Sequence, residues 1–296
     1  MAKQDTIENH DRKIRELTQT TSGYPTSDGQ NVQLIRYIGA QNINLIDPFL
    51  LFDVFQSDKP SDYLGGFPDH PHRGFETVTY LLAGRMRHKD NASHEGVIEA
   101  GGVQWMTAGR GIVHSEMPEQ KNGLLRGFQL WINLPGSKKM VKPSYQEFSA
   151  AYIPSERVSD GGSIKVISGC TSNGTRGPIN NPYTEPIFLD IHLGPAEQPF
   201  EQNIPDDHNS FLYVIHGTLL TGMSRSPVGK EELGILGNGN HVYVSGGKEG
   251  ARFLLITGKR LNEPVARSGP FVMNTREELY EAFQDYRNGN FGGRNP

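Results

Sequence analysis

Two short clusters of metal-binding side chains stand out in the sequence: His70 and His72, separated by one proline, and His114 and Glu116, separated by one serine. Successive side chains of an extended chain point to opposite faces, so the members of each pair share one face. If the two strands are neighbours in a barrel, three imidazoles and one carboxylate converge on one point. This donor set suits Fe, Mn, Ni, Cu or Zn, and the general order of metal affinities does not choose among them.

A single His-x-His pair is weak evidence by itself, because the chain has ten histidines in 296 residues and most lone histidines are surface or hydrogen-bonded core residues. The second pair, with strand-like stretches and glycines between, makes a metal site the preferred interpretation. Spacing leaves one ambiguity open. Glu76 has the same parity as His70 and His72, so strand geometry alone also allows Glu76 as the carboxylate ligand.

Composition predicts a mostly β protein. The length allows one large or two ordinary domains. With 35 glycines, 19 prolines and 35% hydrophobic residues, the chain is suited to many turns joining short strands, as in sandwiches and barrels.

Charge and cysteine content exclude several classes of function. The net charge of −4 and a pI near 6.2 provide no basic surface for nucleic acid, and the short basic pair Lys138-Lys139 is interpreted as solvated. The single cysteine, Cys170, excludes an intramolecular disulfide and fits a reducing compartment. No apolar run approaches membrane-spanning length and the N-terminal residues lack a signal-peptide core, so we expect a soluble cytoplasmic protein.

The order of elements predicts two β-rich halves. Residues 1–30 are polar and are expected to form a loose lead-in. Residues 31–140 are expected to form an N-terminal barrel with the metal site, with strands at 32–38, 75–83 and 127–135. Residues 141–296 are expected to form a C-terminal barrel without metal ligands.

The C-terminal region contains the one clear helical pattern. Thr275 with Glu278 three residues later forms a capping box, and Leu279, Ala282 and Phe283 fall on one stripe. We expect this short helix to pack back on the barrels.

A faint internal repeat supports the division into halves. Residues 211–219 align with 78–86 when Tyr213 is set on Tyr80 and Gly217 on Gly84, and residues 253–257 resemble 128–132. Under the first alignment, Asn203 and Pro205 occupy the positions of the first histidine pair. The second half is therefore predicted to lack the metal site, and its histidines are interpreted as structural: His192, His208, His216 and His241.

The segment HKDNASHE, residues 88–95, reads as a polar loop. Its two histidines, His88 and His94, could reach a metal, but solvated loop histidines are the preferred interpretation.

The motifs resemble those of bicupins. His70, His72 and Glu76 match the cupin pattern H-x-H-x-x-x-E, followed by a glycine at Gly84. The second motif is altered, with matches at Gly111 and His114 but Gly109 in place of a proline and Pro118 in place of an asparagine. Four sequence stretches closely resemble the pirin family: HPHRGFETVTYLLAG, QWMTAGRGIVHSEMP, GFQLWINLP and GPFVMN. The resemblance extends over residues from about 30 to 290.

This resemblance implies an all-β bicupin fold with two jelly-roll halves and a short C-terminal helix. It also implies which residues bind the metal, most often Fe(II): His70, His72, His114 and Glu116. Glu76 is then expected to lie behind the ligands and to orient an imidazole or Arg73.

The resemblance implies two different functions. Some pirin-like proteins are quercetin 2,3-dioxygenases, in which case the partners are O2 and an aromatic enolate such as a flavonol, and Glu116 is the catalytic base. Others resemble iron-dependent regulators that bind a transcription factor or a metabolic enzyme without catalysis of their own. A third interpretation gives the metal a purely structural role.

Overall fold

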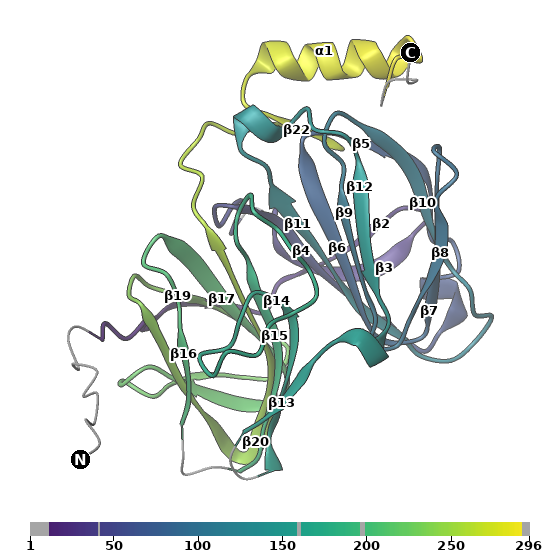
Figure 1. Cartoon of the computed structure of the whole chain (residues 1–296). Helices are drawn as coiled ribbons and strands as arrows, with labels where there is room; N and C mark the ends of the chain where they lie inside the picture. The colour runs from purple at the N-terminus through teal and green to yellow at the C-terminus, as the bar shows by residue number, and fades with distance from the viewer. Residues whose placement is uncertain (1–11, 41, 159–160, 196–198, 292–296) are drawn as a thin grey trace, which may run out of the picture.

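The computed structural model describes residues 12–40, 42–158, 161–195 and 199–291. Two β barrels lie side by side, and the helix α1 (Arg276–Arg287) lies across one end of the N-terminal barrel (Figure 1). The expected all-β bicupin architecture is confirmed. Within the described residues no helix is long and apolar enough to cross a membrane.

The N-terminal barrel is built from two facing sheets. Strands of the larger sheet follow the spatial order β12 (Ser144–Phe148), β9 (Val103–Thr107), β6 (Phe75–Ala83), β11 (Leu125–Asn133), β4 (Phe49–Ser57), β3 (Val32–Ile38) and β2 (Tyr24–Asp28). Strands of the smaller sheet follow the order β5 (Phe67–His72), β10 (Ile112–Pro118), β7 (Arg85–Asp90) and β8 (Glu95–Glu99).

The C-terminal barrel is built on two long bent strands, β17 (His208–Thr221) and β20 (His241–Lys259), which pair with each other. Their register shifts around His216 and Gly217, and such bulges let one strand turn a corner of a barrel. The same sheet includes β1 (Leu17–Thr21), β13 (Ser155–Arg157), β14 (Ser163–Ser168), β15 (Ile187–Leu193), β16 (Phe200–Asn203), β18 (Ser226–Val228) and β19 (Leu233–Leu236). The short strands β21 (Ala266–Ser268) and β22 (Phe271–Met273) form a separate hairpin.

One continuous aromatic core joins the two barrels. It includes Phe52, Tyr80 and Phe128 from the first half and Phe211 and Tyr213 from the second. Ring centroids in this group lie 5.3 to 6.2 Å apart, within the range of favourable aromatic packing. The two barrels therefore pack against each other through a shared core.

Strand β6 has both faces covered, which explains why seven successive residues, Phe75 to Leu81, are buried. Val78 and Tyr80 face the core between the barrels, whereas Thr79 points to the barrel interior and contacts Glu116. A strand that is covered on both sides shows no alternation of buried and exposed residues. Strand β7 instead alternates exposed and buried positions from Arg85 to Asp90, because only one of its faces is inside.

The two chain ends cross over, and this corrects the expected domain boundaries. Strand β1 pairs with β19 in the C-terminal sheet, so the predicted lead-in of residues 1–30 is wrong for this stretch; residues 1–11 lie outside the described part. Strand β12 pairs with β9, so the N-terminal barrel extends beyond residue 140. At the other end, Phe271 bridges to Arg73, and Asp285 of α1 forms a 2.8 Å ion pair with Arg73.

The internal repeat corresponds to equivalent central strands, β6 and β17. Gly84 and Gly217 both have a positive φ, 88° and 75°, a conformation that glycine adopts at little cost. One detail differs from the sequence match. Tyr80 pairs with Phe128 but Tyr213 pairs with Leu254, so the apparent match of 253–257 with 128–132 is displaced by one residue.

The predicted helix is present, and its capping box is formed by both reciprocal hydrogen bonds between Thr275 and Glu278. Leu279 and Ala282 are buried, and Phe283 packs on Phe271 with centroids 4.8 Å apart. The helix thus closes over β22, beside the segment that follows the first histidine pair.

Candidate metal centre

Neighbouring antiparallel strands bring the predicted ligands together. His70 and His72 lie on β5, His114 lies on β10, and His114 is directly opposite His70 in the register. The ring centroid of His70 lies 4.6 Å from that of His72 and 4.5 Å from that of His114. One ligand atom from each of the three imidazoles lies within 4.8 Å of the others. The i, i+2 spacing therefore produces the convergence that the sequence suggested.

Several ring nitrogens in this cluster have no protein partner. Nδ1 of His72 and both ring nitrogens of His114 are buried and have no hydrogen-bond partner among the described residues, which is unfavourable unless a ligand satisfies them. Nδ1 of His70 lies 2.7 Å from the carbonyl oxygen of Pro68. If Nδ1 carries the proton, Nε2 of His70 is left as the metal-binding nitrogen.

Burial keeps the imidazoles neutral. The pKa values of His72 and His114 lie well below the ordinary histidine value, mainly because burial disfavours the charged form and also because the neighbouring histidines oppose a second charge. Neutral imidazole is the form that binds metals. The unpaired nitrogens and the donor chemistry fit a divalent transition metal.

Aromatic side chains enclose the inner side of the cluster. His72 lies 5.1 Å from Phe75 and 5.2 Å from Trp131, measured between ring centroids. The guanidinium carbon of Arg267 lies 4.9 Å from the Trp131 ring. His70 is the partly exposed member of the cluster, so solvent reaches the centre from that side.

Glu116 lies on the same buried face of β10 as His114, and its carboxylate is held by two neighbours. Oε1 lies 2.8 Å from the hydroxyl of Thr79, and Oε2 accepts a hydrogen bond of 3.3 Å from the amide of Gln129. The pairing of β10 with β5 is irregular between His114 and Glu116. Glu116 as the fourth ligand stays a prediction.

Glu76 faces away from this centre, contrary to the expected role. It accepts hydrogen bonds from Thr107 on β9 and from Asn181 of the second half. The spacing argument for Glu76 fails because side chains alternate between two faces only within a single strand. The chain leaves β5 after His72 and turns at Gly74, where φ is 88°, before it enters β6 in the opposite sheet.

The turn after His72 is fixed by contacts that the sequence did not indicate. A Cβ atom at Gly74 would lie 2.0 Å from the carbonyl oxygen of Val272, so only glycine fits. Lys139, expected to be solvated, is 1% exposed and donates to the carbonyls of Gly74 and Val272 and to Oδ1 of Asn133. Burial lowers the Lys139 pKa to about 7.

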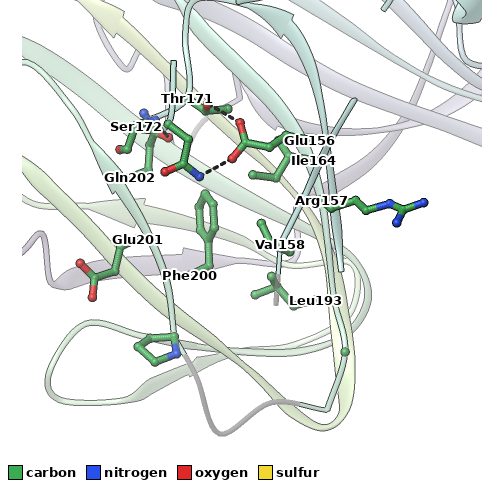
Figure 2. Close-up of a pocket in the computed structure, with 13 residues that line it drawn as sticks. Glu156, Arg157, Val158, Ile164, Thr171, Ser172, Leu193, Phe200, Glu201 and Gln202 are labelled. Atoms are coloured by element: carbon green, nitrogen blue, oxygen red, sulfur yellow. Dashed lines mark hydrogen bonds between the residues drawn. The ribbon is translucent and has the colours of Figure 1, made fainter. Parts of the chain in front are cut away.

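A separate pocket of about 250 Å³ lies in the C-terminal barrel (Figure 2). Phe200, Val158 and Leu193 form its apolar part, and the carboxylate of Glu156 accepts a hydrogen bond from Thr171. None of the described residues that line it is a histidine. The pocket is thus distinct from the histidine cluster.

Comparisons with known proteins agree with this geometry. The family model Pirin matches residues 31–132, and the model of the pirin C-terminal cupin domain matches residues 188–292. A pirin-like protein of Caulobacter vibrioides is 50% identical over 94% of this chain and 99% of its own length. Human pirin is 41% identical over 94% of each chain.

A solved structure shares the whole architecture. The crystal structure of quercetin 2,3-dioxygenase from Acinetobacter baumannii superposes with a TM-score of 0.86 at 30% identity, covering 95% of this chain and 99% of the other. Together with the two matched domains and the convergent histidines, this similarity identifies the chain as a member of the pirin family of bicupin proteins.

Proposed function

We propose that this protein is a metal-dependent dioxygenase of the quercetin 2,3-dioxygenase type, which opens the heterocyclic ring of a flavonol with O2 and releases carbon monoxide. The observation that supports it most is the cluster of His70, His72 and His114, in which the two buried members, His72 and His114, have ring nitrogens without a hydrogen bond among the described residues. The Acinetobacter relative named for this activity supports the choice of substrate class.

In this proposal the three imidazoles hold a divalent ion, Fe(II) in the first instance and otherwise Mn, Ni, Cu or Zn, with Glu116 as the fourth ligand. The bound ion would supply Lewis acidity and, if redox-active, electron transfer toward O2. Three neutral imidazoles and one carboxylate leave the centre with a formal charge of about +1. That charge favours an anionic substrate such as a flavonol enolate.

Glu116 acts as the base that accepts the proton of the substrate 3-hydroxyl group. The Thr79 hydroxyl has one proton and lies 2.8 Å from Oε1 of Glu116 and 2.6 Å from Oε1 of Gln129. It can donate to only one of them at a time. When Thr79 turns to Gln129, Oε1 of Glu116 is free to receive a proton, while Gln129 still holds Oε2.

The aromatic side chains beside the cluster limit the access of water. Phe75 and Trp131 pack against His72 and against each other, with centroids 4.4 Å apart. A dry inner wall strengthens the interaction between an anionic substrate and the centre.

The test is anaerobic reconstitution with Fe(II), followed by addition of quercetin and O2. Flavonol loss is measured by absorbance and carbon monoxide by gas analysis. Metal-dependent turnover at roughly 1 per second or faster, abolished in His72→Ala, is the expected result. Tight metal binding without turnover would overturn the proposal and favour the metal-dependent regulatory role.

A second variant tests the role of Glu116 as the base. Glu116→Ala with metal still bound should lose turnover, and Thr79→Val should change turnover less because Gln129 still holds the carboxylate. Full turnover of metal-loaded Glu116→Ala would remove the base role.

A further inference from the structure

A second cluster of metal-binding side chains lies on the far edge of the N-terminal barrel. His88 on β7, His94 immediately before β8, and Glu147 on β12 each place one donor atom within 4.8 Å of the other two. None of these residues belongs to the first cluster. Contrary to the sequence interpretation, His88 is not in a solvated loop but lies on a strand with a 1% exposed side chain.

The donor atoms of this second cluster converge on one carboxylate oxygen. Nε2 of His88 makes a close contact of 2.6 Å with Oε1 of Glu147, and Nε2 of His94 lies 3.4 Å from the same oxygen. Nδ1 of His88 is buried and has no hydrogen-bond partner among the described residues. Two imidazoles thus meet at one carboxylate oxygen, an arrangement suited to a shared ion.

The surrounding residues form a built site. A Cβ atom at Gly96, opposite His88 in the β7–β8 pairing, would lie 2.4 Å from Nε2 of His88 and 3.0 Å from Oε2 of Glu147. Gly96 therefore leaves the space between the donors open. The amide of Gln104 donates to Oε1 of Glu147, and the Tyr145 ring stacks on His94 at 4.2 Å. Such supporting contacts orient metal ligands.

The position of the cluster gives an ion a structural consequence. Strand β8 is at one edge of the smaller sheet and β12 is at one edge of the larger sheet, so the three donors span the open side between them. The side chains of His94 and Glu147 are 39% and 30% exposed, which provides a route for an ion from solvent. His88 closes the inner side.

We propose that His88, His94 and Glu147 form a second metal site that binds a divalent transition ion, Zn(II) in particular. Two neutral imidazoles and one carboxylate are an established zinc ligand set, with water as the fourth ligand. The ion links β7 and β8 to β12 and thereby joins the edges of the two sheets. This proposal stands independently of the dioxygenase activity, since it concerns other residues.

The test is the stoichiometry of Zn(II) binding to chelator-treated full-length protein, measured by calorimetry and by elemental analysis after gel filtration. Wild type should bind two equivalents. His94→Ala should bind one, with the remaining equivalent lost on adding His72→Ala. Each ligand variant should weaken its own site by at least about 100-fold, since loss of merely supporting residues already weakens metal sites by about 10- to 100-fold.

Two further variants guard against misfolding and adventitious binding. Gly96→Ala keeps all three donors but fills the space between them, so it should also bind one equivalent. His192→Ala, an exposed histidine outside both clusters, should still bind two. Circular dichroism checks that each variant is folded, and Glu147→Gln is the near-isosteric substitute if His94→Ala does not fold.

The proposal is overturned if wild type binds a single equivalent that His72→Ala abolishes. It is equally overturned if His94→Ala, Glu147→Gln and Gly96→Ala all retain two equivalents. Replacement of Zn(II) by Co(II) provides a second readout, because absorption bands assigned to the second site should be present in His72→Ala and absent in His94→Ala.

Discussion

Tyr80 of the N-terminal barrel donates a 2.7 Å hydrogen bond to the Asp190 carboxylate of the C-terminal barrel. Asp190 also accepts two hydrogen bonds from Arg252, of 3.0 and 2.7 Å. This polar contact lies at the border of the aromatic core that joins the barrels: Tyr80 is fully buried in that core, whereas the Arg252 side chain is 36% exposed. A buried carboxylate in such a place is favourable only when it is paired and hydrogen-bonded.

Removal of this hydroxyl should weaken the association of the barrels. Tyr80→Phe leaves Asp190 paired with Arg252 but removes one hydrogen bond, so the free energy of unfolding should fall by about 1–2 kcal/mol. Urea denaturation followed by fluorescence measures the change. Tyr24→Phe, at a 64% exposed tyrosine, is the control, and equal stability of both variants would contradict the prediction.

Lys139 should stabilise the turn that follows the first histidine pair. Lys139→Met removes the donor to Gly74, Asn133 and Val272 and leaves buried oxygen atoms without it. We expect a loss of about 2 kcal/mol or more in unfolding free energy and weaker metal binding. Thermal denaturation checks the first effect and metal titration the second. The neighbouring exposed Lys138 is the matched control, and Lys138→Met should change neither.

Glu76 should make the protein less stable as pH rises. Burial raises its pKa from the unfolded value of 4.5 to about 7, so the folded state retains a proton that the unfolded state has lost between these two values. Stability then decreases from about pH 4.5 to about pH 7 and this contribution stays lost above that range, on the order of 3 kcal/mol in total.

Glu76→Gln isolates this contribution, because the amide does not titrate in that range. The unfolding free energy should decrease less from pH 5 to pH 8 in the variant than it does in wild type. Urea denaturation at both pH values provides the comparison. An identical pH dependence in both proteins would show that Glu76 is ionised in the folded state.

Metal loading should raise thermal stability through the first cluster. A ligand that binds only the folded state at 100 times its dissociation constant adds about 2.7 kcal/mol. Calorimetry of chelator-treated protein with and without Fe(II) under anaerobic conditions should therefore show a higher melting temperature with metal. His72→Ala should lose most of this increase, whereas a full increase in that variant would place the stabilising ion elsewhere.

The convergence of His70, His72 and His114 could be predicted from sequence because their spacing matches the two-residue period of a strand. The pairing of β5 with β10 is regular from His70 to His72 and keeps that period. Glu76 could not be excluded in the same way. The parity rule does not indicate that the chain changes sheet at Gly74, where φ becomes positive. A side chain at Gly74 would clash with the carbonyl of Val272, which is almost two hundred residues away in the chain.

The burial of His88 and Lys139 was not predicted because both residues lie in polar stretches of sequence. The segment around His88 has a composition typical of a loop, but alternate residues of β7, namely Met86, His88 and Asp90, are buried. Lys139 is buried by the C-terminal hairpin, a contact between distant segments that no local pattern reveals. Polar barrel interiors therefore weaken the usual link between hydrophobicity and burial.

The exchange of chain ends between the barrels makes the turn beside the histidine cluster depend on the far end of the chain. Arg73, which directly follows His72, needs Phe271 for its bridge and Asp285 for its ion pair. A truncated chain that holds only the first barrel lacks both partners. The turn therefore reaches its described form only when the chain as far as residue 285 is present.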